Sequence, residues 1–347
     1  MTAARQRREA RRRRVVGGWL LAVAILVFAM VVVGGATRLT ESGLSIVEWA
    51  PVSGILPPLN DEAWAAAFDA YRQTPEYRLV NRGMSLDAFK RIYWWEYAHR
   101  LLGRLIGLAY GLPFLYLLWR RKVPAGLAPR LWTILGLGAL QGAVGWWMVA
   151  SGLVARPDVS HYRLAVHLSL ALVIFAALWW TALGLLTPRR RVPPAAFVRG
   201  GTTAFLVLLA VQVVAGALVA GSKAGFAFNT WPLMEGALVP PDLFAMTPWY
   251  ANLTENILTM QFMHRLLAYG LVALGLWLGW TVWRREADKA ARWLGGGVLA
   301  MLVAQVGLGI WTLLAAVPVW LGTLHQAGAV AVLTLALALR HRLQAPS

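Results

Sequence analysis

Eight long apolar runs interrupt this chain, and they constrain its fold more than any other feature. They lie at residues 15–36, 94–119, 131–154, 161–186, 201–221, 257–283, 293–316 and 318–339. Each reaches roughly the 20 residues that a helix needs to cross the hydrocarbon core of a bilayer. Backbone polar groups inside a membrane must be satisfied within the segment, so such runs form α-helices. The sequence therefore predicts an all-α polytopic membrane protein with eight transmembrane helices.

Composition agrees with this prediction. The 347 residues are 59% hydrophobic and 14% charged, which would expose too much apolar surface in a soluble domain. The net charge of +18 does not indicate nucleic-acid binding, because the basic residues fall in short runs between the apolar segments. The absence of cysteine excludes disulfides, thiolate haem ligands, iron–sulfur clusters and Cys-based zinc sites.

Charge placement predicts the orientation. Residues 1–14 hold seven Arg and one Glu, and we expect a basic cytoplasmic tail before a retained first helix rather than a cleaved signal peptide. Basic runs also follow the second, fourth, sixth and eighth helices: Arg120-Arg121-Lys122, Arg189-Arg190-Arg191, Arg284-Arg285 and Arg340-His341-Arg342. The loops 37–93 and 222–256 then lie outside. Both termini, including a tail at 340–347, are predicted to be cytoplasmic.

The outer loop 37–93 is expected to contain helices that lie at the membrane interface. Residues 61–71 read as a short amphipathic helix with Asn60 or Asp61 as its N-cap, and residues 85–93 read as a second one.

The chain repeats itself. His99-Arg100-Leu101-Leu102 matches His264-Arg265-Leu266-Leu267, and Gly35-Ala36-Thr37 resembles Gly216-Ala217-Leu218. Residues 15–186 and 201–339 are therefore predicted to form two four-helix bundles. Each unit has an even number of spans, so their pseudo-twofold axis would lie along the membrane normal.

Four histidines occur at similar depth in the predicted spans, one on each even-numbered helix: His99, His167, His264 and His325. Two facing imidazoles within a four-helix bundle can supply both axial ligands of a haem iron. The residue four positions after each is small (Gly103, Ala171, Ala268 and Ala329), which leaves room for a macrocycle but equally serves helix packing. Interfacial hydrogen bonding, zinc and a proton relay are the competing interpretations.

One difference breaks the repeat. Glu96 lies three residues before His99, whereas Gln261 lies three residues before His264. Only a carboxylate can take a proton or place negative charge beside a reacting centre. The first bundle is thus predicted to be catalytic and the second to carry electrons. Arg100 and Arg265 could pair with haem propionates or extend to the outer headgroups.

Several stretches together resemble the haem A synthase family, in its proteobacterial and mitochondrial branch. They are GGATRLTESGLSIVEW, LPPLNDEAWAAAFDAYRQTPEYRLVNRGMSLDAFK, EYAHRLLGRLIG, FNTWPLMEG, MHRLLAY and TLHQAG, and the similarity runs from about Gly34 to the end of the eighth helix. Some family members carry cysteine pairs in their outer loops, and this chain has none. A disulfide-dependent step therefore cannot belong to its mechanism.

The resemblance implies that the chain oxidises the C8 methyl of haem O to a formyl group, giving haem A for cytochrome oxidase. His99 and His167 would flank the substrate haem O, with Arg100 nearby, and Glu96 would assist charge or proton handling. A haem b cofactor would be ligated by His264 and His325, with Arg265 nearby.

The resemblance also implies a bacterial inner membrane location, and haem O synthase and cytochrome oxidase assembly factors as partners. It leaves open the electron acceptor, the route by which haem O enters, and the oligomeric state, including a homo-oligomer. Without it, a di-haem cytochrome b-type electron carrier or a quinol oxidoreductase would explain the four histidines equally well. A transporter would predict no haem at all.

Overall fold

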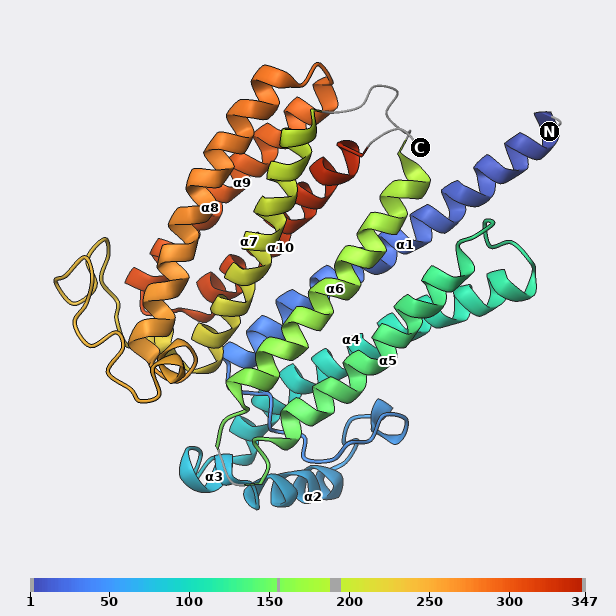
Figure 1. The fold of residues 1–347 in the computed structure, drawn as a ribbon. Helices are drawn as coiled ribbons and strands as arrows, with labels where there is room; N and C mark the ends of the chain where they lie inside the picture. The colour runs from blue at the N-terminus through green and yellow to red at the C-terminus, as the bar shows by residue number, and fades with distance from the viewer. Residues whose placement is uncertain (1–2, 155–156, 188–194, 345–347) are drawn as a thin grey trace. The chain divides into compact units, whose positions relative to one another are not determined.

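The computed structural model describes residues 3–154, 157–187 and 195–344, and these are helices joined by loops. Eight of the helices are long and apolar enough to cross a membrane. They are α1 (Ala3–Leu39), α4 (Leu86–Trp119), α5 (Ala128–Ala150), α6 (His161–Leu186), α7 (Ala196–Gly221), α8 (Ile257–Arg285), α9 (Lys289–Leu314) and α10 (Val319–Arg342) (Figure 1). Each predicted span corresponds to one helix, which confirms the all-α, multi-pass membrane fold.

The end helices extend beyond their apolar runs. Helix α1 begins at Ala3, so most of the predicted basic tail is helical, and α10 continues to Arg342. Arginine propagates a helix well once the apolar part has formed it. His341 therefore belongs to α10 and packs edge-on against Trp180 of α6, with ring centroids 5.1 Å apart. The predicted basic run Arg189-Arg190-Arg191 lies outside the described residues.

The outer loop contains one helix that the sequence predicts and one that it does not. Helix α2 (Asp61–Arg72) is confirmed, and the Asn60 side chain caps it by accepting from the Ala63 amide at 2.8 Å. The prediction of a separate helix at 85–93 was wrong. No Gly or Pro interrupts residues 86–102, so this stretch forms the beginning of α4. Helix α3 (Pro75–Leu79) was not predicted. Short 3-10 turns occur at Ser53–Ile55, Ala224–Phe226 and Trp249–Leu253.

Aromatic packing holds α2 and α3 onto the start of α4. The cluster consists of Trp64, Phe68, Tyr71, Phe89 and Tyr93. Beside it Glu76 is 5% exposed and accepts a hydrogen bond from Tyr71 Oη at 3.1 Å. Burial, with a smaller contribution from neighbouring carboxylates, raises the pKa of Glu76 to about 8.

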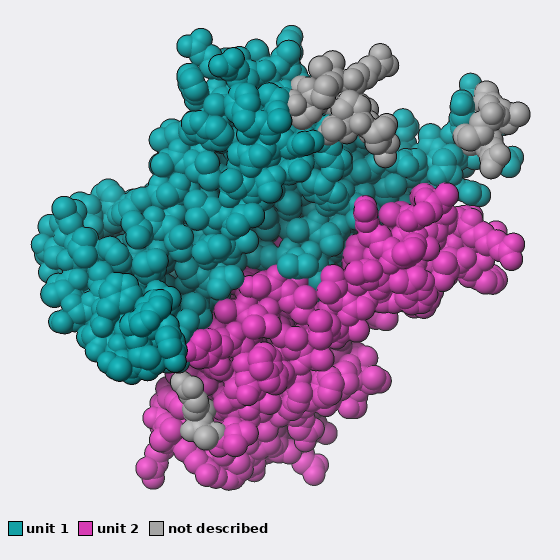
Figure 2. Space-filling model, in the orientation of Figure 1, with its two compact units in different colours: residues 1–24, 172–347 teal, residues 25–171 magenta. Residues whose placement is uncertain are grey.

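The chain divides into two compact units, residues 1–24 with 172–347 and residues 25–171 (Figure 2). In the first unit, α7 to α10 form a four-helix bundle in which each helix packs on the next and α10 returns to α7. Its core contains Phe205, Leu278 and Leu302. The approach of α7 to α8 is close, since a Cβ on Gly201 would lie 2.3 Å from the Trp277 ring.

The second unit contains the rest of α1, then α2 to α5 and the first part of α6. Helix α4 packs on α5 over a shorter stretch than α8 packs on α9. Tyr110 of α4 donates to the Leu131 carbonyl of α5 at 2.7 Å, which joins the two helices below their outer ends. The outer part of this unit, where α4 carries its polar residues, holds one of the two candidate sites.

Replacement of Gly201 by Ala should destabilise the protein, because the new methyl group would collide with the Trp277 ring of α8. We expect a loss of about 1–3 kcal/mol in unfolding free energy, the usual range for overpacking. The neighbouring Gly200 has open space where its Cβ would be, so Gly200→Ala is the matched control and should be neutral or slightly stabilising. Thermal unfolding in detergent would measure both variants, and equal effects would contradict the close α7–α8 approach.

The stability of the outer segment should fall as pH rises. Because the pKa of Glu76 lies above its ordinary value of 4.5, the folded state binds this proton more tightly than the unfolded state. Its contribution, on the order of a few kcal/mol, is complete below about pH 4.5 and is lost as pH rises through about 8. Glu76→Gln should flatten the pH dependence of thermal unfolding between these values. Glu62→Gln, at an exposed position, should leave it unchanged.

Candidate active site

Each of the four membrane-level histidines lies against a glycine of the preceding transmembrane helix. A Cβ on Gly34, Gly145, Gly216 and Gly309 would lie 3.1, 3.0, 3.0 and 2.8 Å from the rings of His99, His167, His264 and His325, respectively. Any larger side chain would displace the imidazole, so these glycines allow the helix backbone to approach the ring. The sequence repeat thus corresponds to a repeated helix contact.

The structure brings the histidines together in twos. His99 lies within electrostatic range of His167, and His264 lies within electrostatic range of His325. All four rings are partly exposed, as are the small residues one turn further along: Gly103, Ala171, Ala268 and Ala329. Within the described residues, no group of three or more His, Asp or Glu side chains comes together as a metal site.

Three glutamines contact the histidines, and the sequence analysis missed them. Gln141 of α5 donates to the His167 carbonyl at 3.1 Å, and its Nε2 lies 3.2 Å from His167 Nδ1. Gln212 of α7 makes the same contacts to His264, at 3.1 and 3.2 Å. Gln305 of α9 does so to His325, at 2.8 and 3.1 Å. The detectable signal was a glutamine four residues before three of the four contacting glycines.

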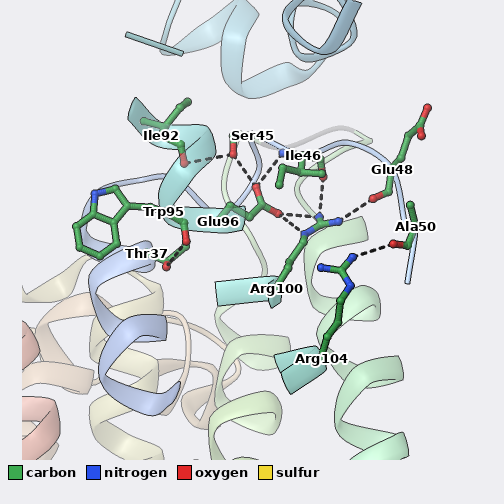
Figure 3. Close-up of polar contacts among 10 residues, drawn as sticks. All are labelled: Thr37, Ser45, Ile46, Glu48, Ala50, Ile92, Trp95, Glu96, Arg100 and Arg104. Atoms are coloured by element: carbon green, nitrogen blue, oxygen red, sulfur yellow. Dashed lines mark hydrogen bonds and ion pairs between the residues drawn. The ribbon is translucent and has the colours of Figure 1, made fainter. Parts of the chain in front are cut away.

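Glu96 lies at the centre of a polar network in the N-terminal part of α4 (Figure 3). It is 2% exposed, and each carboxylate oxygen accepts two hydrogen bonds. Ser45 Oγ and the Ile46 amide both donate to Oε2 at 2.8 Å. Arg100 donates to Oε1 from Nε at 3.0 Å and from Nη2 at 2.7 Å. The charge is therefore paired, as a buried carboxylate requires.

The arginines of α4 bind the loop that follows α1, a role that the sequence analysis did not consider. Arg100 donates to the Ile46 and Glu48 carbonyls, both at 2.7 Å. One turn further along α4, Arg104 donates to the Ala50 carbonyl at 2.8 Å (Figure 3). It also donates to the Pro51 carbonyl at 2.9 Å. Residues 45–51 are thereby fastened over the outer end of α4.

The second half repeats this clamp without the negative charge. Arg265 donates to Gln261 Oε1 at 2.8 Å and to the Phe228 and Thr230 carbonyls, both at 2.9 Å. Gln261 Nε2 donates to the Ala224 carbonyl at 3.0 Å. The loop after α1 thus presents N–H and O–H donors to Glu96, whereas the loop after α7 presents a carbonyl acceptor to Gln261. Each side chain suits its own loop, which gives the Glu–Gln difference a structural function.

The residues of each half fit a haem. Each half has two histidines within electrostatic range of each other, small residues one turn along their helices, and glycines that keep the neighbouring backbone close. Buried guanidinium N–H groups at Arg104 Nη1 and Arg265 Nε have no hydrogen-bond partner among the described residues, so they remain able to bind carboxylates.

Comparison with known proteins finds a matching family model and several similar relatives. Residues 17–337 match the model of the COX15-CtaA family, described as cytochrome oxidase assembly protein. The heme A synthase of Bradyrhizobium sp. strain BTAi1 is 54% identical, over 94% of this chain and 90% of the relative. The heme A synthase of Parvibaculum lavamentivorans is 52% identical, over 94% and 93%. That of Rhodopseudomonas palustris strain BisB5 is 54% identical, over 99% and 95%.

The family model matches most of the chain, and these relatives are more than half identical to it over nearly all of its length. The chain therefore belongs to the COX15-CtaA family of cytochrome oxidase assembly proteins, which includes these heme A synthases.

Proposed function

We propose that this protein is a haem A synthase, which oxidises the C8 methyl of haem O to a formyl group. The observation that carries the proposal is a pair of equivalent histidine sites of which only one has a carboxylate, in a chain 54% identical to heme A synthases. Two successive hydroxylations of the methyl carbon each take an oxygen atom from water and pass two electrons to an external electron acceptor, with release of two protons. They give a hydrated aldehyde, and loss of water gives the formyl group. Haem A then serves cytochrome oxidase.

In this proposal the two halves have different occupants. His99 and His167 hold the substrate haem O in the first half, and His264 and His325 ligate a haem b cofactor in the second. Haem b, when bound, supplies electron transfer to and from the substrate site. The chain contributes the ligands, the small residues beside them and a helix environment that excludes bulk water.

Glu96 is the proposed catalytic residue. It lies one turn before His99 on α4, so its charge is near the ligand of the first half. A fixed negative charge stabilises positive charge that develops on the methyl carbon during oxidation. Arg100 orients the carboxylate through two hydrogen bonds to Oε1. The second half has an amide at this position, which suits a site that carries electrons.

The arginines are proposed to bind haem propionates with the N–H groups that their loops leave unused. Arg100 commits four of its five N–H groups to Glu96 and the loop carbonyls. Arg104 and Arg265 each retain a buried N–H without a partner among the described residues. Guanidinium groups bind carboxylates strongly in such settings. Arg104 therefore joins Arg100 and Arg265 in this proposed role.

We further propose that the protein lies in the bacterial inner membrane with both termini cytoplasmic. The basic runs between helices support this orientation. Haem O synthase, as the source of substrate, and cytochrome oxidase assembly factors, as acceptors of product, are the proposed partners. The electron acceptor and a homo-oligomeric state are separate questions.

A di-haem cytochrome b-type electron carrier or a quinol oxidoreductase is the second candidate, because the bis-histidine arrangement serves it equally well. Such a carrier needs no carboxylate in one half only. Extracted pigment distinguishes the two functions: cells that express the chain and contain haem O should accumulate haem A. Haem A at background level would defeat the synthase proposal and leave the carrier.

Removal of second-half ligands should remove the cofactor. We expect His264→Ala and His325→Ala to lower the ratio of haem b to protein severely, because the haem iron then loses one of its two axial ligands. His99→Ala and His167→Ala should keep haem b but lose haem A formation. His341→Ala, at the far end of α10, is the control that should retain both. Soret absorbance of purified protein and extraction of its haems measure these outcomes.

Replacement of Glu96 by Gln should preserve bound haem and stop oxidation at or before the alcohol. Loss of a preorganised electrostatic group reduces turnover by roughly 100-fold or more. The measurement is the ratio of haem O, hydroxylated haem and haem A in extracts from cells. Haem A at the normal level would contradict the catalytic role.

A second variant separates charge from loop anchoring. Ser45→Ala removes one hydrogen bond to Glu96 Oε2 but leaves the carboxylate in place. If the charge matters, this variant should retain most haem A formation. If both variants lose it equally, Glu96 acts by anchoring the loop, and the catalytic assignment is wrong.

A further inference from the structure

Three of the four histidine rings are held in one manner. For His167, His264 and His325, the ring edge nearest the facing glycine carries Cε1, with Nδ1 next, and a glutamine amide nitrogen lies within hydrogen-bond distance of Nδ1. For His167 and His264 this nitrogen also lies 3.4 and 3.3 Å from the ring Nε2. The same amide nitrogen also binds the histidine's own carbonyl. Each ring is therefore confined by a glycine backbone and by an amide that is itself anchored to the helix.

The space around one glutamine shows how closely it is fitted. A Cβ on Gly328 of α10 would lie 2.0 Å from Gln305 Oε1. No hydrogen bond to this oxygen, or to the corresponding oxygens of Gln141 and Gln212, exists among the described residues. Three glutamines with the same contacts and the same unpaired oxygen form a repeated device rather than a chance packing of polar groups.

His99 differs from the other three. The glutamine position, four residues before the contacting glycine, is occupied by Met30. His99 has no side-chain hydrogen bond with any described residue, and its ring is turned so that Nε2 and Cδ2 face Gly34. The Met30 methyl group lies 3.2 Å from the position of a Cβ on Gly103, one turn beyond His99. A thioether offers only a weak acceptor, so it cannot hold the imidazole as an amide does.

A hydrogen bond to the second nitrogen of an imidazole fixes the ring orientation of a metal ligand. The three histidines with glutamine partners are therefore preorganised ligands. His99 can rotate between its observed orientation and one that binds iron. The difference matters because a cofactor must remain bound through many turnovers, whereas a substrate must enter and leave.

We propose that Gln141, Gln212 and Gln305 are positioning residues that lock three histidine ligands, and that Met30 leaves His99 as the releasable ligand through which haem is exchanged. This inference rests on the proposed assignment of substrate to the first half. His167, which Gln141 holds in place, keeps the haem bound on one side while His99 dissociates from the iron on the other. The second half has two locked ligands and retains its haem.

Transfer of haem from the purified holoprotein to apomyoglobin tests the inference. The haems that remain are extracted over time, and haem O plus haem A is counted separately from haem b. In the natural chain, haem O plus haem A should leave faster than haem b. Met30→Gln should slow its release by about threefold to tenfold, the effect of one membrane hydrogen bond, and leave haem b unaffected.

The converse variant tests the second half. Gln212→Met should accelerate haem b release by about threefold to tenfold and leave the other haem unaffected. It should also shift the electron paramagnetic resonance g values of the low-spin ferric haem, which depend on the orientation of the imidazole plane. Gln305→Met is the alternative if Gln212→Met folds poorly. A lower thermal stability with unchanged release rates and g values would show helix packing alone and overturn the proposal.

Met30→Leu is the matched control, because it removes the sulfur without adding an amide. Its release rates should equal those of the natural chain. Equal slowing by Met30→Leu and Met30→Gln would attribute the effect to packing and overturn the proposal, as would no slowing by Met30→Gln. Failure of the natural chain to form haem A would defeat the proposed function instead, and the release rates would still be measured from the bound haems.

Discussion

Contact between a histidine ring and the backbone of a neighbouring helix is the constraint on which both candidate sites depend. It requires glycine on α1, α5, α7 and α9, because a methyl group there would lie about 3 Å from the imidazole. The contact determines how closely these helices approach α4, α6, α8 and α10, respectively, and at what height along the helix axis. The glutamines follow from it, since a residue four positions before the glycine lies on the same helix face.

A second constraint is electrostatic. A carboxylate at the outer end of α4 is stable only with partners, and Glu96 has four hydrogen bonds from Arg100, Ser45 and Ile46. These bonds also fasten the loop that follows α1. The second half achieves the same anchoring with Gln261 and Arg265, whose loop offers a carbonyl in place of donors. In the first half, one residue therefore both anchors the loop and places a negative charge. In the second half, Gln261 anchors the loop without a charge.

Much of the fold follows from local sequence properties. The eight spans are evident because apolar length is sufficient to place a helix in a membrane. The cap at Asn60 is evident because short polar side chains before an amphipathic run stabilise a helix start. The prediction of a separate helix at 85–93 failed because its amphipathic pattern is the same whether the stretch stands alone or begins α4. The helical extension of α1 into the basic tail also has no local apolar signal.

The sequence by itself determined the number of spans, the four membrane-level histidines, and the Glu96–Gln261 difference, because residue type, spacing and apolar length can be read along one chain. Only the tertiary structure decided that Gln141 meets His167, that Arg104 binds the loop after α1, and that the His99 ring is turned away from the orientation of the others. Such contacts join residues on different helices or loops. They depend on the rotation and height at which each helix packs, and no local pattern encodes either quantity.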